Sequence, residues 1–243
     1  MYDWKTLSRL GLVLLCLPLL HMAYLAWNAY ADLSNPSPEV WEPQLQAIID
    51  RDQRLRLPAA PVVVTGGHSA RLWKDLPAAI SERPTLIRPL GGATLEDLTY
   101  HYDRLIGYYR PSVLIVLPSY ADLHLRDSKS AAQLAEALSA LLSRNTALAV
   151  TSRRYVVMPA KTLLHPQDSA RIDEMAAAAR SVARGLPFTV VIDPNPQLAG
   201  EDGAPNPAYF RSDGINLNPE GYAVLSALVR KQLISDGMIN APG

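Results

Sequence analysis

Short apolar runs alternate with longer amphipathic stretches along most of this chain. Five runs are rich in β-branched residues and predict buried strands: residues 61–66, 85–90, 112–118, 154–159 and 188–193. Four stretches carry apolar side chains at helical spacing and predict helices: residues 95–109, 130–143, 169–184 and 219–235. The strands are continuously apolar, a pattern typical of a sheet covered on both faces. The alternation therefore predicts an α/β fold, a three-layer α/β/α sandwich around a mostly parallel five-stranded sheet.

The start of the chain follows a different pattern. Residues 10–27 form an apolar run interrupted by His21, close to the shortest helix that crosses a bilayer. Basic residues precede the run and acidic residues follow it, which predicts that the rest of the chain lies outside the cytoplasm. A signal peptide cleaved at the A-x-A pattern of residues 29–31 is the alternative. We favour an uncleaved transmembrane helix that contacts the membrane through residues 10–30, because aromatic residues gather at its end, as at a membrane interface.

The chain divides into three predicted parts. Residues 1–31 are the membrane anchor or signal peptide, residues 32–45 a proline-rich polar linker, and residues 46–243 the α/β domain. Both interpretations of the first part place this domain in the periplasm or outside the cell. Lysine plus arginine and aspartate plus glutamate number 23 each, so the formal net charge is zero. A neutral chain without long basic runs does not predict a nucleic-acid partner.

The loops beside the predicted strands carry the candidate chemistry, because parallel α/β sheets bind ligands at the carboxyl ends of their strands. Four segments stand at such positions: TGGHSARLW, PLGGATLEDL, PSYADLHL and SDGINLNPEGY. In this order they closely resemble the sequence blocks of the SGNH (GDSL-type) hydrolases, a family of esterases and acetylesterases. The resemblance covers residues 60–235. It implies the fold of that family and a cleft built for serine-based ester hydrolysis.

Most of the catalytic residues that the resemblance implies are replaced in this chain. In the alignment without gaps from Gly66 to Trp73, His68 stands at the position of the nucleophilic serine, and a shift of one residue places Ser69 there instead. Gly92 matches the glycine whose backbone N–H holds the oxyanion. The resemblance implies a second donor, an asparagine, where this chain has Ala121.

The last block is also degenerate. Asp213 matches the aspartate that orients the base, but Asn216 replaces the histidine that acts as the base. An asparagine amide takes up no proton near neutral pH, so it cannot activate a serine hydroxyl. In a serine protease, removal of the serine or its base alone reduces turnover about 10⁶-fold. The conventional acyl-enzyme mechanism is therefore not expected.

The remaining polar residues allow other roles. His68 could pair with Asp213 as a base or binding group, or fill the space that the serine leaves. Tyr120 and neighbouring polar side chains would line a cleft suited to a carbohydrate. His124, just after the third segment, is expected on a solvated loop, with a turn into the cleft as the alternative, and His165 is expected to be structural or on the surface. No group of histidine, cysteine, aspartate and glutamate has metal-ligand spacing, so neither a metal nor another cofactor is expected.

Together these features predict a membrane-anchored, envelope-facing protein with a hydrolase fold. We expect a binding or accessory role, on an acylated carbohydrate or with a protein partner of the envelope, without conventional esterase activity. The alternative is a working ester hydrolase or deacetylase that uses Ser69 or His68 with an unusual base.

Overall fold

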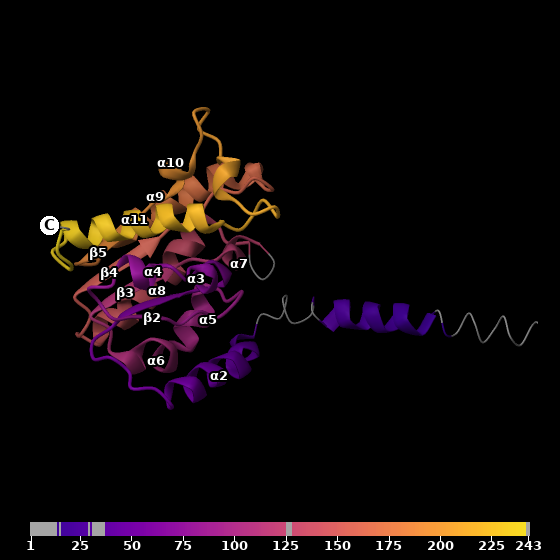
Figure 1. Cartoon of the computed structure of the whole chain (residues 1–243), viewed down its shortest axis with the longest axis horizontal. Coiled ribbons are helices and arrows are strands. Elements are labelled where there is room, and N and C mark those ends of the chain that lie inside the picture. Colours follow the sequence, from indigo (N-terminus) through magenta and orange to yellow (C-terminus); the bar gives the residue numbers. More distant parts are fainter. Residues whose placement is uncertain (1–13, 15, 29, 31–36, 125–127, 242–243) are drawn as a thin grey trace, which may run out of the picture.

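The computed structural model describes residues 14, 16–28, 30, 37–124 and 128–241 (Figure 1). Residues 14, 16–28 and 30 are helical, and their side chains are mostly exposed. Within the described residues, no helix has the length and apolar character needed to span a bilayer. The apolar run at 10–27 lies partly outside the described residues, so its role as an anchor stays a prediction.

A five-stranded parallel sheet forms the centre of the domain. Its strands lie in the order β2-β1-β3-β4-β5. Their bounds are β1 (Val62–Gly66), β2 (Thr85–Ile87), β3 (Val113–Leu117), β4 (Arg153–Val157) and β5 (Thr189–Ile192). All pairs in the sheet are parallel, with Val62 opposite both Thr85 and Val113. The predicted strands and the α/β class are confirmed.

Helices cover both faces of the sheet, as Figure 1 shows. One face is covered by α2 (Glu42–Asp52), α5 (Leu95–Tyr100), α6 (Tyr102–Leu105), α8 (Ala131–Ala147) and α9 (Ser169–Gly185). The other is covered by α3 (His68–Leu72), α4 (Leu76–Ala79) and α11 (Pro219–Ser235). Successive side chains of a strand point to opposite faces of the sheet. Leu114 therefore packs against the helices of the first face and Ile115 against those of the other. The predicted three layers follow from this alternation.

Short helical turns occupy the connections between these elements. They are η1 (Pro38–Trp41), η2 (Gly107–Tyr109), α7 (Tyr120–Leu123), η3 (Pro166–Asp168), α10 (Asn195–Leu198) and η4 (Pro207–Tyr209). The single helix predicted over 95–109 is wrong in detail, because it divides into α5, α6 and η2. The first break falls at His101, whose buried ring donates from Nε2 to the carbonyl oxygen of Pro38 at 2.7 Å.

The packed domain begins before the predicted boundary at residue 46. Both η1 and the first residues of α2 fall inside the predicted linker of residues 32–45, and Leu45 is fully buried. At the end of α2, the Asp52 carboxylate accepts hydrogen bonds from Arg88 at 2.8 and 3.0 Å. The hydroxyl of Tyr109 donates to the same carboxylate at 2.5 Å. This buried ion pair fixes α2 to the residue that follows β2.

Candidate functional site

A pocket of about 520 Å³ opens at the carboxyl ends of β1, β3 and β4. It brings together six of the seven site residues expected from the sequence: His68, Ser69, Gly92, Tyr120, Ala121 and Asn216. The seventh, Asp213, lines a neighbouring hollow and reaches the pocket through its contact with Asn216. Apolar side chains form much of the remaining wall, among them Leu117, Val157, Met158 and Leu225. The four resembling segments therefore do converge on one cavity.

The end of β1 determines where His68 stands. Gly66 has a φ of +150°, and a Cβ there would lie 2.4 Å from the carbonyl oxygen of Leu117 on β3. Only glycine tolerates this conformation and this close approach. The chain then turns, and His68 becomes the first residue of α3. His68 is exposed and Ser69 half-buried, and both face the pocket.

Ser69 has no histidine to activate it. Its carbonyl oxygen accepts a hydrogen bond from the hydroxyl of Tyr222 at 3.0 Å, which ties the start of α3 to α11. Across the described part of the chain, the Ser69 hydroxyl makes no hydrogen bond to an imidazole nitrogen. The structure therefore does not contain the serine–histidine hydrogen bond that activates a serine in conventional hydrolases.

Asp213 and Asn216 form a pair with the arrangement of an aspartate and the base that it orients. Oδ2 of Asp213 accepts from the Asn216 side-chain amide at 2.8 Å. Oδ1 accepts from the backbone N–H groups of Ile215 and Asn216 at 2.9 and 2.8 Å. Desolvation acts in the opposite direction, but these hydrogen bonds and the charge of Arg211 hold the pKa of Asp213 below its usual value. The carboxylate of Asp213 is thus ionised near neutral pH, and it already accepts a hydrogen bond from the neutral amide of Asn216.

His68 does not replace the absent histidine as a hydrogen-bond partner of Asp213. Among the residues that the structure describes, it forms no hydrogen bond to Asp213 or Asn216, so the structure does not contain the His68–Asp213 pair that the sequence allows. Burial, followed by the positive charges of Arg71 and Arg211, lowers the pKa of His68, while the charge of Asp213 opposes this. These effects favour the neutral form of the His68 imidazole, which lines the pocket.

Gly92 and Ala121 occupy the positions where the resemblance implies the two donors to an oxyanion. Gly92 has a φ of +99°, in the region that favours glycine, and lines the pocket. Its backbone N–H has no hydrogen-bond partner within the described ranges, so it is free to donate to a ligand. Ala121 also lines the pocket and offers only a methyl group. One donor of this kind accounts for about 10²–10³ in the turnover of well-studied hydrolases.

The third segment also positions α7. Asp122 accepts hydrogen bonds from the N–H groups of Leu95 at 3.0 Å and Ser119 at 2.8 Å. These bonds join the start of α5 to the end of β3. Burial outweighs them and raises the pKa of Asp122 to about 6. Asp122 therefore holds the loop rather than facing the pocket.

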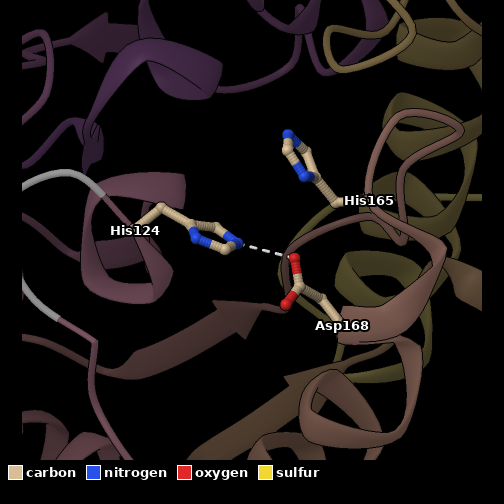
Figure 2. Close-up of side chains that lie close together, drawn as sticks. All are labelled: His124, His165 and Asp168. Atoms are coloured by element: carbon tan, nitrogen blue, oxygen red, sulfur yellow. Dashed lines mark hydrogen bonds and ion pairs between the residues drawn. The ribbon is translucent and has the colours of Figure 1, made fainter.

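Sequence reasoning missed one group of residues on the pocket wall. His124 and His165, expected on surface loops, both line the pocket. Nε2 of His124 lies 2.6 Å from Oδ2 of Asp168 (Figure 2). The candidate ligand atoms of His124, His165 and Asp168 all lie within 4.8 Å of one another, which corrects the expectation that no residues are arranged as metal ligands. Spacing along the chain gave no signal, because the residues come from loops after two different strands.

Comparison with solved structures identifies the fold. A protein assigned as an acylhydrolase, from Bacteroides fragilis, superposes with a TM-score of 0.67 at 19% identity, over 80% of this chain and 97% of that one. A GDSL-like lipase from Bacteroides thetaiotaomicron gives 0.60 at 17% identity, over 79% and 98%. A catalytic mutant of an acetylxylan esterase from Geobacillus stearothermophilus gives 0.58 at 10% identity, over 74% and 96%. No protein-family model matches the chain, and neither does any curated protein sequence.

The domain therefore has the fold of the GDSL-type (SGNH) hydrolases. The structural neighbours are acylhydrolases and esterases, and the pocket of this chain lies at the ends of strands where such folds bind their ligands.

Proposed function

We propose that this chain binds an acylated ligand, an acylated glycan of the cell envelope or an acylated partner, and lacks conventional serine-esterase activity. The observation that carries the proposal is the Asp213–Asn216 pair. The side-chain amide of Asn216 donates a hydrogen bond to Oδ2 of Asp213 at 2.8 Å, where a histidine base would otherwise be held. A base at this position would need to accept a proton, and an amide cannot do so near neutral pH. Ala121 removes a donor from the same corner.

The walls of the pocket support an acyl ligand. Leu117, Val157, Met158 and Leu225 form an apolar surface that suits an acyl chain. His68, Tyr120 and Asn216 offer hydrogen-bonding groups that suit sugar hydroxyls. The acetylxylan esterase among the structural neighbours acts on an acylated glycan by its name, and we extend that substrate class to this chain only as a proposal.

We further propose that the apolar run at residues 10–27 tethers the domain to a membrane with the domain in the periplasm or outside the cell. The support is the length of the run and the basic residues before it. Flotation of the full chain with lipid vesicles tests this point. If the full chain, with residues 10–27 intact, does not float with the vesicles, this result would contradict the membrane tether.

The test of the pocket is ester turnover by the full chain, with p-nitrophenyl acetate and an acetylated sugar, in the presence of a metal chelator. We expect no turnover above the uncatalysed rate in the natural chain or in Ser69→Ala, His68→Ala and Asp213→Ala. The triple variant His68→Ser, Ala121→Asn, Asn216→His rebuilds the implied machinery and is the matched comparison. If only this variant turns over the ester, the lack of esterase activity in the natural chain is caused by those three replacements.

The second candidate is an ester hydrolase that uses Ser69 or His68, because both line the pocket. The same assay separates it from our proposal. Turnover by the natural chain that Ser69→Ala abolishes would identify Ser69 as the nucleophile. Turnover that only His68→Ala abolishes would identify an imidazole base, and either result would overturn the binding role.

A further inference from the structure

We propose that His124, His165 and Asp168 form a binding site for a divalent transition metal, with Zn²⁺ as the best match, on the wall of the pocket. The proposal does not depend on which ligand the pocket binds or on the state of the serine machinery. It rests on the geometry, chemistry and position of these three side chains.

The geometry is close to that of a metal site. Figure 2 shows His124 on one side, and His165 and Asp168 on the segment that faces it. The two imidazole rings lie 5.3 Å apart between centroids, and the possible ligand atoms all lie within 4.8 Å. Around a tetrahedral zinc ion with bonds of about 2.0–2.1 Å, neighbouring ligand atoms lie roughly 3.3 Å apart. Small movements of the side chains are therefore enough to admit the ion.

The ligand chemistry fits the same class of ion. Two imidazoles and one carboxylate are a ligand set of catalytic zinc sites, which keep a further position open for water or substrate. Asp168 precedes α9, and its side chain makes no capping hydrogen bond to that helix, so its oxygens remain available to the cluster. Asp168 stands at the N-terminal end of α9, where the helix dipole is positive. Its side chain is 10% exposed.

The open position would face the ligand pocket. His124 and His165 both line it, and the ring of Tyr120 packs against both, with centroids 4.7 and 5.7 Å away. Only a long hydrogen bond would compete with a metal for His165 among the described residues. It joins Nδ1 of His165 to the side-chain nitrogen of the exposed Gln167 at 3.3 Å. A metal in this place would act as a Lewis acid on a carbonyl or hydroxyl oxygen of the bound molecule.

A purely structural explanation makes a different prediction. The 2.6 Å contact between His124 and Asp168 could serve only to join α7 to the loop after β4. In that case His165 would be an unrelated neighbour, and the cluster would bind no ion.

The experiment is a calorimetric titration of the full chain, freed of metal by a chelator, with ZnCl₂. We expect one Zn²⁺ per chain. His124→Ala, His165→Ala and Asp168→Asn should each weaken binding at least tenfold, since even residues that only orient metal ligands account for about 10–100-fold. Asp168→Asn preserves the shape of the side chain and its ability to accept from His124, so a loss in this variant is not a loss of folding.

Two control variants carry comparable changes outside the cluster. Asp173→Asn alters an exposed carboxylate five residues further along the chain, in α9, where it binds Lys161 at 2.8 Å. His21→Asn alters an exposed histidine in the N-terminal helical residues. Both should bind zinc like the natural chain. Absence of stoichiometric binding, or equal affinity in all variants, would overturn the proposal, and neither result would bear on the ester assay.

Discussion

At the scale of single residues, Asn216 makes the hydrogen bonds to Asp213 that a histidine at this position could make. Its side-chain amide donates to Asp213 at 2.8 Å, as an imidazole N–H would, and its backbone N–H donates to the same carboxylate. The loop conformation therefore does not depend on a histidine.

The charge state of His68 is the first prediction at this scale. Because burial and the charges of Arg71 and Arg211 lower its pKa, its NMR titration should have a midpoint below the ordinary value of about 6.5. Arg71→Gln should raise the midpoint, and Asp213→Asn should lower it further. Arg180→Gln, which alters an arginine bound to Asp193, should leave it unchanged. A midpoint at or above the ordinary value in the natural chain would contradict the prediction.

The sign of the linked stability change follows from the same shift. Between the lowered pKa of the folded chain and the ordinary pKa, the unfolded chain binds more protons at His68 than the folded chain does. The contribution of His68 to the free energy of unfolding therefore decreases as the pH falls through that window. Replacement by glutamine should remove this part of the pH dependence, measured by urea unfolding between pH 5 and 8.

At the scale of elements, α2 depends on one buried ion pair. Asp52 is 3% exposed and receives two hydrogen bonds from Arg88, one from Tyr109 and a longer one of 3.4 Å from its neighbour Arg51. Asp52→Ala would leave the Arg88 guanidinium buried without its partner, which typically costs about 3–5 kcal/mol. Urea unfolding should show this loss. Asp103→Ala breaks an exposed pair with Arg144 and should change stability little. Equal effects of both variants would show that the buried pair is not what holds α2.

At the scale of elements, some features of the structure can be predicted from the sequence and others cannot. The strands are found because a covered parallel sheet needs continuous apolar runs, and β1 and β3 are buried throughout. The helix over 95–109 is divided because His101 binds Pro38, 63 residues away, which no local pattern contains. Gly92, Ala121 and Asn216 could be grouped from the sequence, and they line one pocket, because their loops carry segments that resemble known blocks. The His124–Asp168 pair is not, because its members follow different strands.

At the scale of the whole molecule, the topology makes a single cavity from distant segments. β1 and β4 flank β3, so the loops after all three strands meet, and α11 closes the pocket through Leu225. A molecule in this pocket contacts the polar mouth, the apolar wall and the His124 cluster together. This arrangement is what the proposed binding role requires of the fold.

Ligand binding in this pocket should therefore stabilise the entire fold. A ligand that binds only the folded chain adds about 2.7 kcal/mol to the free energy of unfolding at 100 times its Kd. We expect glucose octanoate to raise the midpoint of thermal unfolding and free glucose to have little effect, because the apolar wall supplies most of the contact. Ala160→Trp, at a half-buried position of the wall, should fill the pocket and abolish the octanoate shift. Ala177→Trp, on the exposed side of α9, should preserve it. An equal shift with free glucose, or a shift that survives Ala160→Trp, would place the ligand elsewhere on the molecule.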